Sequence, residues 1–286
     1  MTLDAASAQT VLADAMLAGF RRAVEAVAAA SADIADAARR LAEVWRGGGR
    51  CVYLGAGASG LVAAEDAAEL PGTFGLDEAR IIIRLAGGVE QPFHTDAAAE
   101  DDAVVGEREI RLLGDLSKDA VIAVSASGST PYTLGAVEAA RARGAFVIGI
   151  ANRAGSPLLR SASAPILLDS GEEAVQGSTR LAAGVAQKCA LGMLSTRLGL
   201  ELGHVHRGLM VNLRADNDKL RRRALGIVAT LADIPEERAR AALHAADGDV
   251  KQAVLIAHGA AGPRAAGALL AAADGRLELA LKSLRG

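Results

Sequence analysis

Apolar residues recur at steps of three and four positions through the first part of the chain, which is the period of an amphipathic helix. The pattern covers residues 4–47 and restarts at Ser31. A run of glycines at 47–49 ends it, as glycines commonly do at the C-terminus of a helix. The pattern therefore predicts two antiparallel helices within an N-terminal helical segment at residues 1–48.

Short apolar runs without polar alternation follow, as expected of strands that are buried on both faces of a sheet. They lie at residues 50–54, 81–85, 120–124, 145–150 and 165–168. Helical patterns separate several of the runs, at residues 61–70, 90–113 and 134–143. Alternation of strands and helices predicts a parallel sheet with right-handed crossovers and helices on both faces, which is an α/β fold of three αβα layers.

The chain becomes helical again beyond residue 176. Two long stretches with an apolar face lie at residues 178–202 and 217–231. The tail from Pro235 carries three short helical patterns, broken at Asp247-Gly248-Asp249 and at Gly262-Pro263. We therefore expect a central domain at residues 49–214, with its helical continuation to about residue 232, and a small helical module at residues 233–286.

Charge and cysteine content exclude several classes of protein. The 31 basic residues nearly balance 34 acidic residues, and aromatic residues make up only 2% of the chain, so neither electrostatics nor base stacking indicates a nucleic-acid partner. Cys51 and Cys189 belong to no Cys-x-x-Cys pair or Cys/His cluster, which argues against a disulfide framework and a structural zinc site. No apolar run reaches the roughly 18 residues of a membrane span, and the N-terminus lacks the pattern of a signal peptide. These features predict a cytoplasmic protein with no membrane partner.

Ligands of an open parallel sheet bind at the carboxyl ends of its strands, so the residues after each strand matter most. The first strand is followed by Gly55-Ala56-Gly57-Ala58-Ser59-Gly60, called the first loop, which then opens a helix. Glycines permit a tight turn, and the free N–H groups of a helix N-terminus attract an anion. A dinucleotide site would need an acid at the end of the second strand, but that strand ends in Leu85-Ala86-Gly87-Gly88. The first loop therefore gives no support for NAD.

The third strand is followed by a second loop, Ser125-Ala126-Ser127-Gly128-Ser129-Thr130, which again precedes a helix. Hydroxyls and free N–H groups at the start of a helix suit a phosphate group. A polar turn with a helix cap is the alternative for either loop taken by itself. Two such loops on strands of one parallel sheet favour a phosphorylated small ligand.

The two loops resemble those of the SIS (sugar isomerase) phosphosugar-binding domain, and longer stretches are similar to the N-acetylmuramic acid 6-phosphate etherase family. The similar stretches lie at residues 52–60, 66–75, 99–102, 126–132, 177–181, 186–188, 193–196, 209–211 and 217–220. Residues 241–251 resemble the C-terminal small helical (UBA-like) module of that family. The resemblance thus covers the chain from about residue 50 to about residue 260.

The resemblance implies a lyase that removes D-lactate from C3 of a sugar phosphate and adds water, without a cofactor or a metal. The product would be N-acetylglucosamine 6-phosphate, as in cell-wall recycling. It implies that Glu69 is the proton donor and Glu100 the second acid/base, although a surface glutamate is the alternative for both. It also implies a homodimer. The residues expected to bind the phosphosugar are Gly57, Ser59, Gly60, Ser125, Ser127, Gly128, Ser129, Thr130 and Ser178.

The chain departs from the family pattern at Ala58, Leu61, Ser129 and Ala182, where the family usually has threonine, arginine, arginine and lysine. Each lost cation or hydroxyl removes a contact to phosphate or carboxylate. Two alternative functions therefore remain open: a phosphosugar aldose–ketose isomerase and a sugar-phosphate sensor without catalysis.

The histidines give weaker signals. His94, before Glu100, is either an acid/base for ring opening or a surface residue. His204 and His206 have no third ligand that would complete a metal site.

Overall fold

The computed structural model describes residues 5–88 and 97–285 of the chain. These residues belong to two compact units. The first unit comprises Met1–Ala68 and Ala79–Ser195, and the second comprises Glu69–Glu78 and Thr196–Gly286.

A five-stranded parallel sheet forms the centre of the first unit, as the continuous apolar runs predicted. Its strands are β1 (Cys51–Gly55), β2 (Ile81–Leu85), β3 (Ala120–Val124), β4 (Phe146–Ala151) and β5 (Ala164–Leu167). They lie in the order β2-β1-β3-β4-β5, and β1 and β3 are buried along their whole length. Gly55 is in register with Val124, so the first and second loops leave the sheet side by side.

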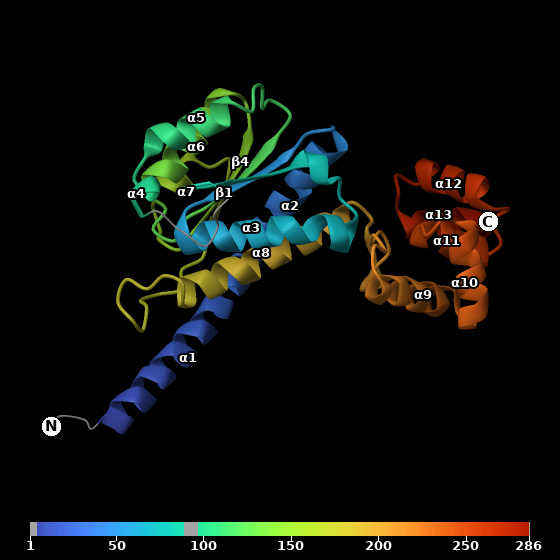
Figure 1. The fold of residues 1–286 in the computed structure, drawn as a ribbon, viewed down its shortest axis with the longest axis horizontal. Helices are drawn as coiled ribbons and strands as arrows, with labels where there is room; N and C mark the ends of the chain where they lie inside the picture. The colour runs from blue at the N-terminus through green and yellow to red at the C-terminus, as the bar shows by residue number, and fades with distance from the viewer. Residues whose placement is uncertain (1–4, 89–96, 286) are drawn as a thin grey trace. The chain divides into compact units, whose positions relative to one another are not determined.

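Helices cover both faces of this sheet, which confirms the predicted αβα layers. Figure 1 shows α5 and α6 on one side and α3 and α8 on the other. On the α5–α6 side, Val52 and Val121 of the sheet pack against Ile110, Val137 and other apolar side chains. The helices of this unit are α1 (Ala5–Ala29), α2 (Ser31–Arg46), α3 (Gly57–Phe74), α4 (Ala97–Glu100), α5 (Ala103–Arg111), α6 (Pro131–Ala142), α7 (Pro157–Ser161) and α8 (Ala182–Glu201), of which α3 and α8 continue into the second unit.

A buried polar contact joins β1, α3 and α8. Asp66 accepts hydrogen bonds from Tyr53 Oη at 3.2 Å and from Ser195 Oγ at 2.9 Å. Burial raises the pKa of Asp66 to about 6, against the opposing effect of these two hydrogen bonds. This contact fixes the helix that follows the first loop against the strand that precedes it.

The single helix expected at residues 90–113 is wrong in its described part. Residues 89–96, which include His94, lie outside the described residues. Beyond them, Asp101 and Asp102 separate the short helix α4 from α5. The Asp102 carboxylate accepts a hydrogen bond from the Val105 N–H at 2.9 Å and so caps α5. An aspartate favours this capping position over a helix interior, which explains the break.

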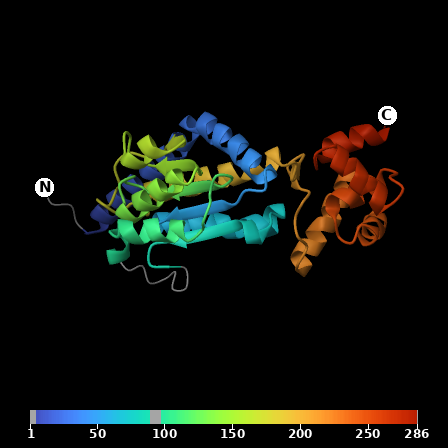
Figure 2. The ribbon, with the colours of Figure 1, turned by 90° about the horizontal axis from the view of Figure 1, so that it is seen from above.

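The second unit contains a short hairpin and a group of short helices, coloured orange to red in Figure 2. Its elements are β6 (Val205–His206), β7 (Leu209–Met210), α9 (Asp218–Ala232), α10 (Glu236–Ala245), α11 (Val250–Ala257), α12 (Pro263–Ala272) and α13 (Leu277–Arg285). Val211, Val228 and Leu255 lie in its core. The tail thus has four helices where three patterns were expected, because Asp274 and Gly275 both adopt a positive φ and end α12.

Among the described residues, no helix is long and apolar enough to cross a bilayer. Both cysteines are free. Burial raises the pKa of the Cys51 thiol to about 12, so this sulfur stays protonated and unreactive at neutral pH.

Candidate active site

The first loop turns from β1 directly into α3. A Cβ at Gly60 would lie 2.8 Å from the carbonyl oxygen of Gly55, so the chain can close this tightly only with glycine at position 60. Gly57 has a φ of +50°, which also favours glycine. Ser59 is buried within the first turn of α3. The loop therefore brings the N-terminus of α3 to the carboxyl edge of the sheet, as predicted.

Glu100 lies against this loop. A Cβ added to Gly57 would lie 2.5 Å from Glu100 Oε1, so the carboxylate occupies the space next to the Gly57 backbone. The neighbouring Ala99 packs with Ala56, Ala86 and other apolar residues at the ends of β1 and β2. A carboxylate is favoured beside a helix N-terminus by the helix dipole. The separation of 43 positions between Gly57 and Glu100 hides this contact from any local sequence pattern.

The hydroxyls of the second loop converge on one another. Ser125 Oγ and Thr130 Oγ1 share a hydrogen bond of 2.8 Å, and the Gly128 N–H donates to Ser125 Oγ at 3.1 Å. Ser129 Oγ donates to Ser127 Oγ at 3.0 Å. Ser125 is buried, whereas Ser127 and Ser129 are exposed at the surface of the unit. The loop thus presents hydroxyls at the start of α6, next to the first loop.

The other two predicted site residues belong to other segments of the chain. Glu69 is an exposed residue of α3, twelve positions after Gly57, and a rise of 1.5 Å per residue makes this about 18 Å of helix axis. Ser178 lies in the segment before α8, where its N–H donates to the Val175 carbonyl at 2.9 Å. Within the first unit, the structure brings together Glu100 and the two loops.

Two polar groups at this part of the first unit were not singled out from the sequence. The Gln187 side chain, buried on α8, donates to Asn152 Oδ1 at 2.9 Å, just after β4. The Glu173 carboxylate accepts from the N–H groups of Ala182 and Ala183, each at 2.9 Å, and so caps α8. Isolated amide and carboxylate residues such as these carry no pattern by which sequence reasoning could find them.

Ala182, where the family usually has lysine, lies close to α1. Ala182 is 2% exposed, and a Cβ on Gly19 of α1 would lie 3.5 Å from the Ala182 Cβ. Position 182 is therefore buried beside α1. Leu61, in contrast, is 37% exposed on α3.

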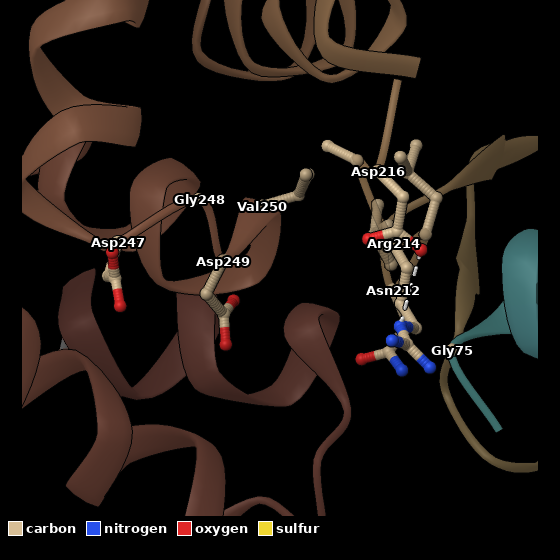
Figure 3. Close-up of a pocket in the computed structure, with 11 residues that line it drawn as sticks. Gly75, Asn212, Arg214, Asp216, Asp247, Gly248, Asp249 and Val250 are labelled. Carbon is tan, nitrogen blue, oxygen red and sulfur yellow. Dashed lines mark ion pairs between the residues drawn. The ribbon is translucent and has the colours of Figure 1, made fainter. Parts of the chain in front are cut away.

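A separate cavity of about 430 Å³ lies in the second unit (Figure 3). Asn212, Arg214 and Asp216 line it from one segment, and Asp247 and Asp249 line it from the turn before α11. Two of these acids are already engaged, since Asp216 pairs with Arg214 at 3.6 Å and Asp249 accepts from the Gln252 N–H in the first turn of α11. This cavity offers no free pair of acids for proton transfer.

The described residues contain no group of three or more His, Cys, Asp or Glu side chains that could hold a metal ion. His204 is largely buried, and burial, with the Lys251 charge as a smaller cause, lowers its pKa to about 4. His206 also has a lowered pKa, mainly because of burial. Both histidines are therefore neutral at pH 7.

Comparison with known proteins gives consistent matches. Models of the SIS domain match residues 17–152 and 115–197. An N-acetylmuramic acid 6-phosphate etherase of Deinococcus radiodurans is 41% identical over 257 residues, covering 88% of this chain and 84% of that protein. Its counterparts in Streptomyces avermitilis and Rubrobacter xylanophilus are 44% and 43% identical, each over 90% of this chain and over 82% and 86% of their own lengths.

A solved Escherichia coli structure in complex with A5P is 19% identical, with a TM-score of 0.49, and covers 67% of this chain and 91% of that one. The assignment does not depend on that structure, because the curated relatives match nearly the whole chain at about 40% identity. The chain belongs to the N-acetylmuramic acid 6-phosphate etherase family of SIS-domain proteins.

Proposed function

We propose that this protein is a carbon–oxygen lyase that cleaves the D-lactyl ether of N-acetylmuramic acid 6-phosphate. The products are N-acetylglucosamine 6-phosphate and D-lactate. Identity above 40% over 82–86% of the length of etherases from three organisms is the observation that carries this proposal. The position of the Glu100 carboxylate beside two loops suited to a phosphate group supports it.

The proposed reaction is an elimination followed by addition of water. Glu100 removes the proton at C2 of the ring-opened sugar, and the electron pair forms a C2–C3 double bond as the C3–O bond breaks. Glu69 gives a proton to the departing lactate oxygen. Water then adds at C3, and a proton returns to C2. The phosphate is held by the hydroxyls and N–H groups of the second loop at the start of α6.

We further propose a homodimer in which Glu69 of one subunit completes the site around Glu100 of the other. About 18 Å of helix axis separates Glu69 from Gly57 within a chain, which is too far for both carboxylates to act on one sugar. Val11, Leu17 and Val24 of α1 are more than half exposed, so this helix offers apolar surface for a second copy. Two-fold symmetry would create two identical sites.

The proposed location is the cytoplasm, where both thiols would stay reduced. Release of D-lactate from N-acetylmuramic acid 6-phosphate by the purified protein tests the activity. In deuterated water, the product should carry deuterium at C2, and ¹⁸O from labelled water should enter at C3. Formation of a ketose without lactate would indicate an isomerase instead, and binding without any product would indicate a sensor.

Hybrid dimers test the shared site. Glu69→Gln and Glu100→Gln each keep the size of the side chain but remove proton transfer, so turnover should fall by about 10²–10⁴-fold in either variant. Mixing the two inactive variants under conditions that exchange subunits should restore part of the activity, because each hybrid dimer has one site with both glutamates. If the mixture stays inactive while co-purification through an affinity tag on one variant shows that hybrid dimers have formed, the two glutamates act within one chain or not at all.

A further inference from the structure

Ser156 carries a buried hydroxyl without a partner. The residue is 3% exposed. Its Oγ is one of three buried side-chain polar atoms, within the described ranges, that lack a hydrogen-bond partner. An unpaired buried hydroxyl destabilises the conformation that buries it, so a serine here needs an explanation.

The position of Ser156 explains what its hydroxyl would normally do. Ser156 immediately precedes α7, with the extended backbone that is typical of a helix cap. A serine at this position usually accepts a hydrogen bond from the second or third N–H of the helix. Ser156 makes no such bond, and the Leu158 N–H donates instead to the carbonyl oxygen of Gly128 at 2.9 Å. The second loop thus supplies the cap of α7 in place of Ser156.

Gly128 also packs closely against Ser156. Gly128 has a φ of +62°, and a Cβ on it would lie 2.5 Å from Ser156 Cβ and would overlap the Ser156 hydroxyl. Ala151, at the end of β4, borders the same space at 3.1 Å from that Cβ. The second loop therefore sits directly on Ser156, and only a glycine at position 128 allows it to do so.

We propose that Ser156 is a positioning residue for the second loop, because its hydroxyl and the Gly128 carbonyl compete for the same Leu158 N–H. With the loop docked, as observed, Gly128 caps α7 and the Ser156 hydroxyl is left without a partner. With the loop released, a rotation of the Ser156 side chain provides the cap. Each state keeps one cap on the Leu158 N–H, so the loop can dock on a phosphate and let it go without leaving this N–H unpaired.

The effect on binding follows from the arrangement of the loop. The docked state holds the hydroxyls of Ser125 and Thr130 together beside the first loop. This inference rests on the proposed function insofar as the second loop holds the phosphate of the sugar. Ser156→Ala removes both the competing cap and the unpaired hydroxyl, and therefore shifts the equilibrium towards the docked loop. Phosphosugar should then bind more tightly and leave more slowly.

Hydrogen exchange tests the docking step without any ligand. In Ser156→Ala, the amides of residues 125–130 should exchange about threefold to tenfold more slowly than in the wild-type protein. Ser156→Gly, which also lacks the hydroxyl and is tolerated before a helix, should behave alike if the alanine variant folds poorly. Ser163→Ala is the matched control: Ser163 lies just after α7 and its Oγ accepts from the Val147 N–H at 3.3 Å, away from the loop. Exchange of the loop that stays unchanged or becomes faster in Ser156→Ala overturns the proposal.

Calorimetry with N-acetylglucosamine 6-phosphate tests the consequence for the ligand. The Kd should fall by about threefold to tenfold in Ser156→Ala and stay constant in Ser163→Ala, and kcat should fall together with KM as product release slows. Weaker binding in Ser156→Ala would show that the docked loop is not the binding form, and would overturn the inference. Slower loop exchange in a protein that releases no lactate would support the role of Ser156 and remove only the proposed etherase activity.

Discussion

Replacing Gly57 with alanine is expected to separate the role of Glu100 from the stability of the fold. Gly57 is the first residue of α3, with a φ of +50°. The added Cβ would lie 2.5 Å from Glu100 Oε1, closer than non-bonded heavy atoms approach. Glu100 is the flexible partner in this contact, so its carboxylate should move away from the first loop while the backbone of the loop stays in place.

The expected magnitudes differ for stability and for activity. A residue with a side chain loses about 1–2 kcal/mol in the left-handed conformation relative to glycine. For a chain of this size, that loss lowers Tm by roughly 2–8 °C. Displacement of a general acid or base removes much of a contribution of about 10²–10⁴-fold to turnover. The variant should therefore fold with a modest loss of stability and lose most of its kcat/KM for N-acetylmuramic acid 6-phosphate.

Gly48 supplies the matched control. It also has a positive φ, of +82°, but a Cβ at this position would meet no atom within 4 Å. Gly48→Ala should therefore lose a similar amount of stability and keep full kcat/KM in a D-lactate release assay. The double variant Gly57→Ala/Glu100→Gln should be no slower than Glu100→Gln alone, because both changes remove the same group. Equal kcat/KM values for Gly57→Ala and Gly48→Ala would refute a role for Glu100 at its observed position.

Three further predictions concern the scaffold. Gly106→Ala would place a Cβ of α5 against the carbonyl oxygen of Tyr132 on α6, so the free energy of unfolding should fall by about 1–3 kcal/mol. An unchanged urea denaturation curve would contradict this close packing. Arg50→Ala should lower the free energy of unfolding by about 3 kcal/mol in the same assay, because it leaves the buried Asp119 carboxylate, which Arg50 binds at 2.6 Å, without its charged partner. The Kd for phosphosugar should stay unchanged. The folded protein disfavours protonation of His204, whose pKa is about 4 against an ordinary 6.5. The free energy of unfolding should therefore fall as the pH drops from 6.5 towards 4. In His204→Gln, the free energy of unfolding should depend less on pH over this range.

The centre of the sheet could be predicted because β1 and β3 are buried along their whole length. β1 and β3 have no polar side chain to break the apolar run, and their predicted bounds differ from the observed ones by one residue at most. The order β2-β1-β3-β4-β5 had no such signal, since it is set by how the crossover helices pack on the finished sheet. The prediction of one helix over residues 90–113 failed for a local reason. The Asp102 carboxylate accepts a hydrogen bond from the N–H of Val105 and starts a new helix there, although the apolar pattern continues on both sides.

The site was only partly accessible to sequence reasoning for a related reason. Both loops could be found because glycines and hydroxyls cluster directly after strands. The contact of Glu100 with Gly57 and that of Gln187 with Asn152 join residues far apart in the sequence, and only tertiary packing brings them together. Ser156 showed no signal at all, because its importance lies in a hydrogen bond that it does not make.

The first loop leads into the N-terminus of α3 and the second loop into the N-terminus of α6. Each of these N-termini can attract a different anion, either the Glu100 carboxylate or the sugar phosphate. The N-terminus of α3 faces the Glu100 carboxylate, so a phosphate placed there would meet like charge. The first turn of α6 contains no acidic residue, and the hydroxyls of the second loop surround its start. Under the proposed mechanism, the sugar phosphate therefore fits best at α6, with its reacting carbons turned towards Glu100.

That division also gives the departures from the family pattern a physical meaning. Where the family usually has arginine, Ser129 is neutral and exposed, so the phosphate would rest on hydroxyls and the dipole of α6 alone. A hydrogen bond to a charged group contributes about 1.5–3 kcal/mol, and a neutral one about half of that. Ala182, where the family usually has lysine, carries no charge that could replace the lost cation. Under the proposed mechanism, binding energy that the phosphate does not supply must come from the sugar and its lactyl group. The choice of substrate would then depend more on Glu69 of the proposed second subunit.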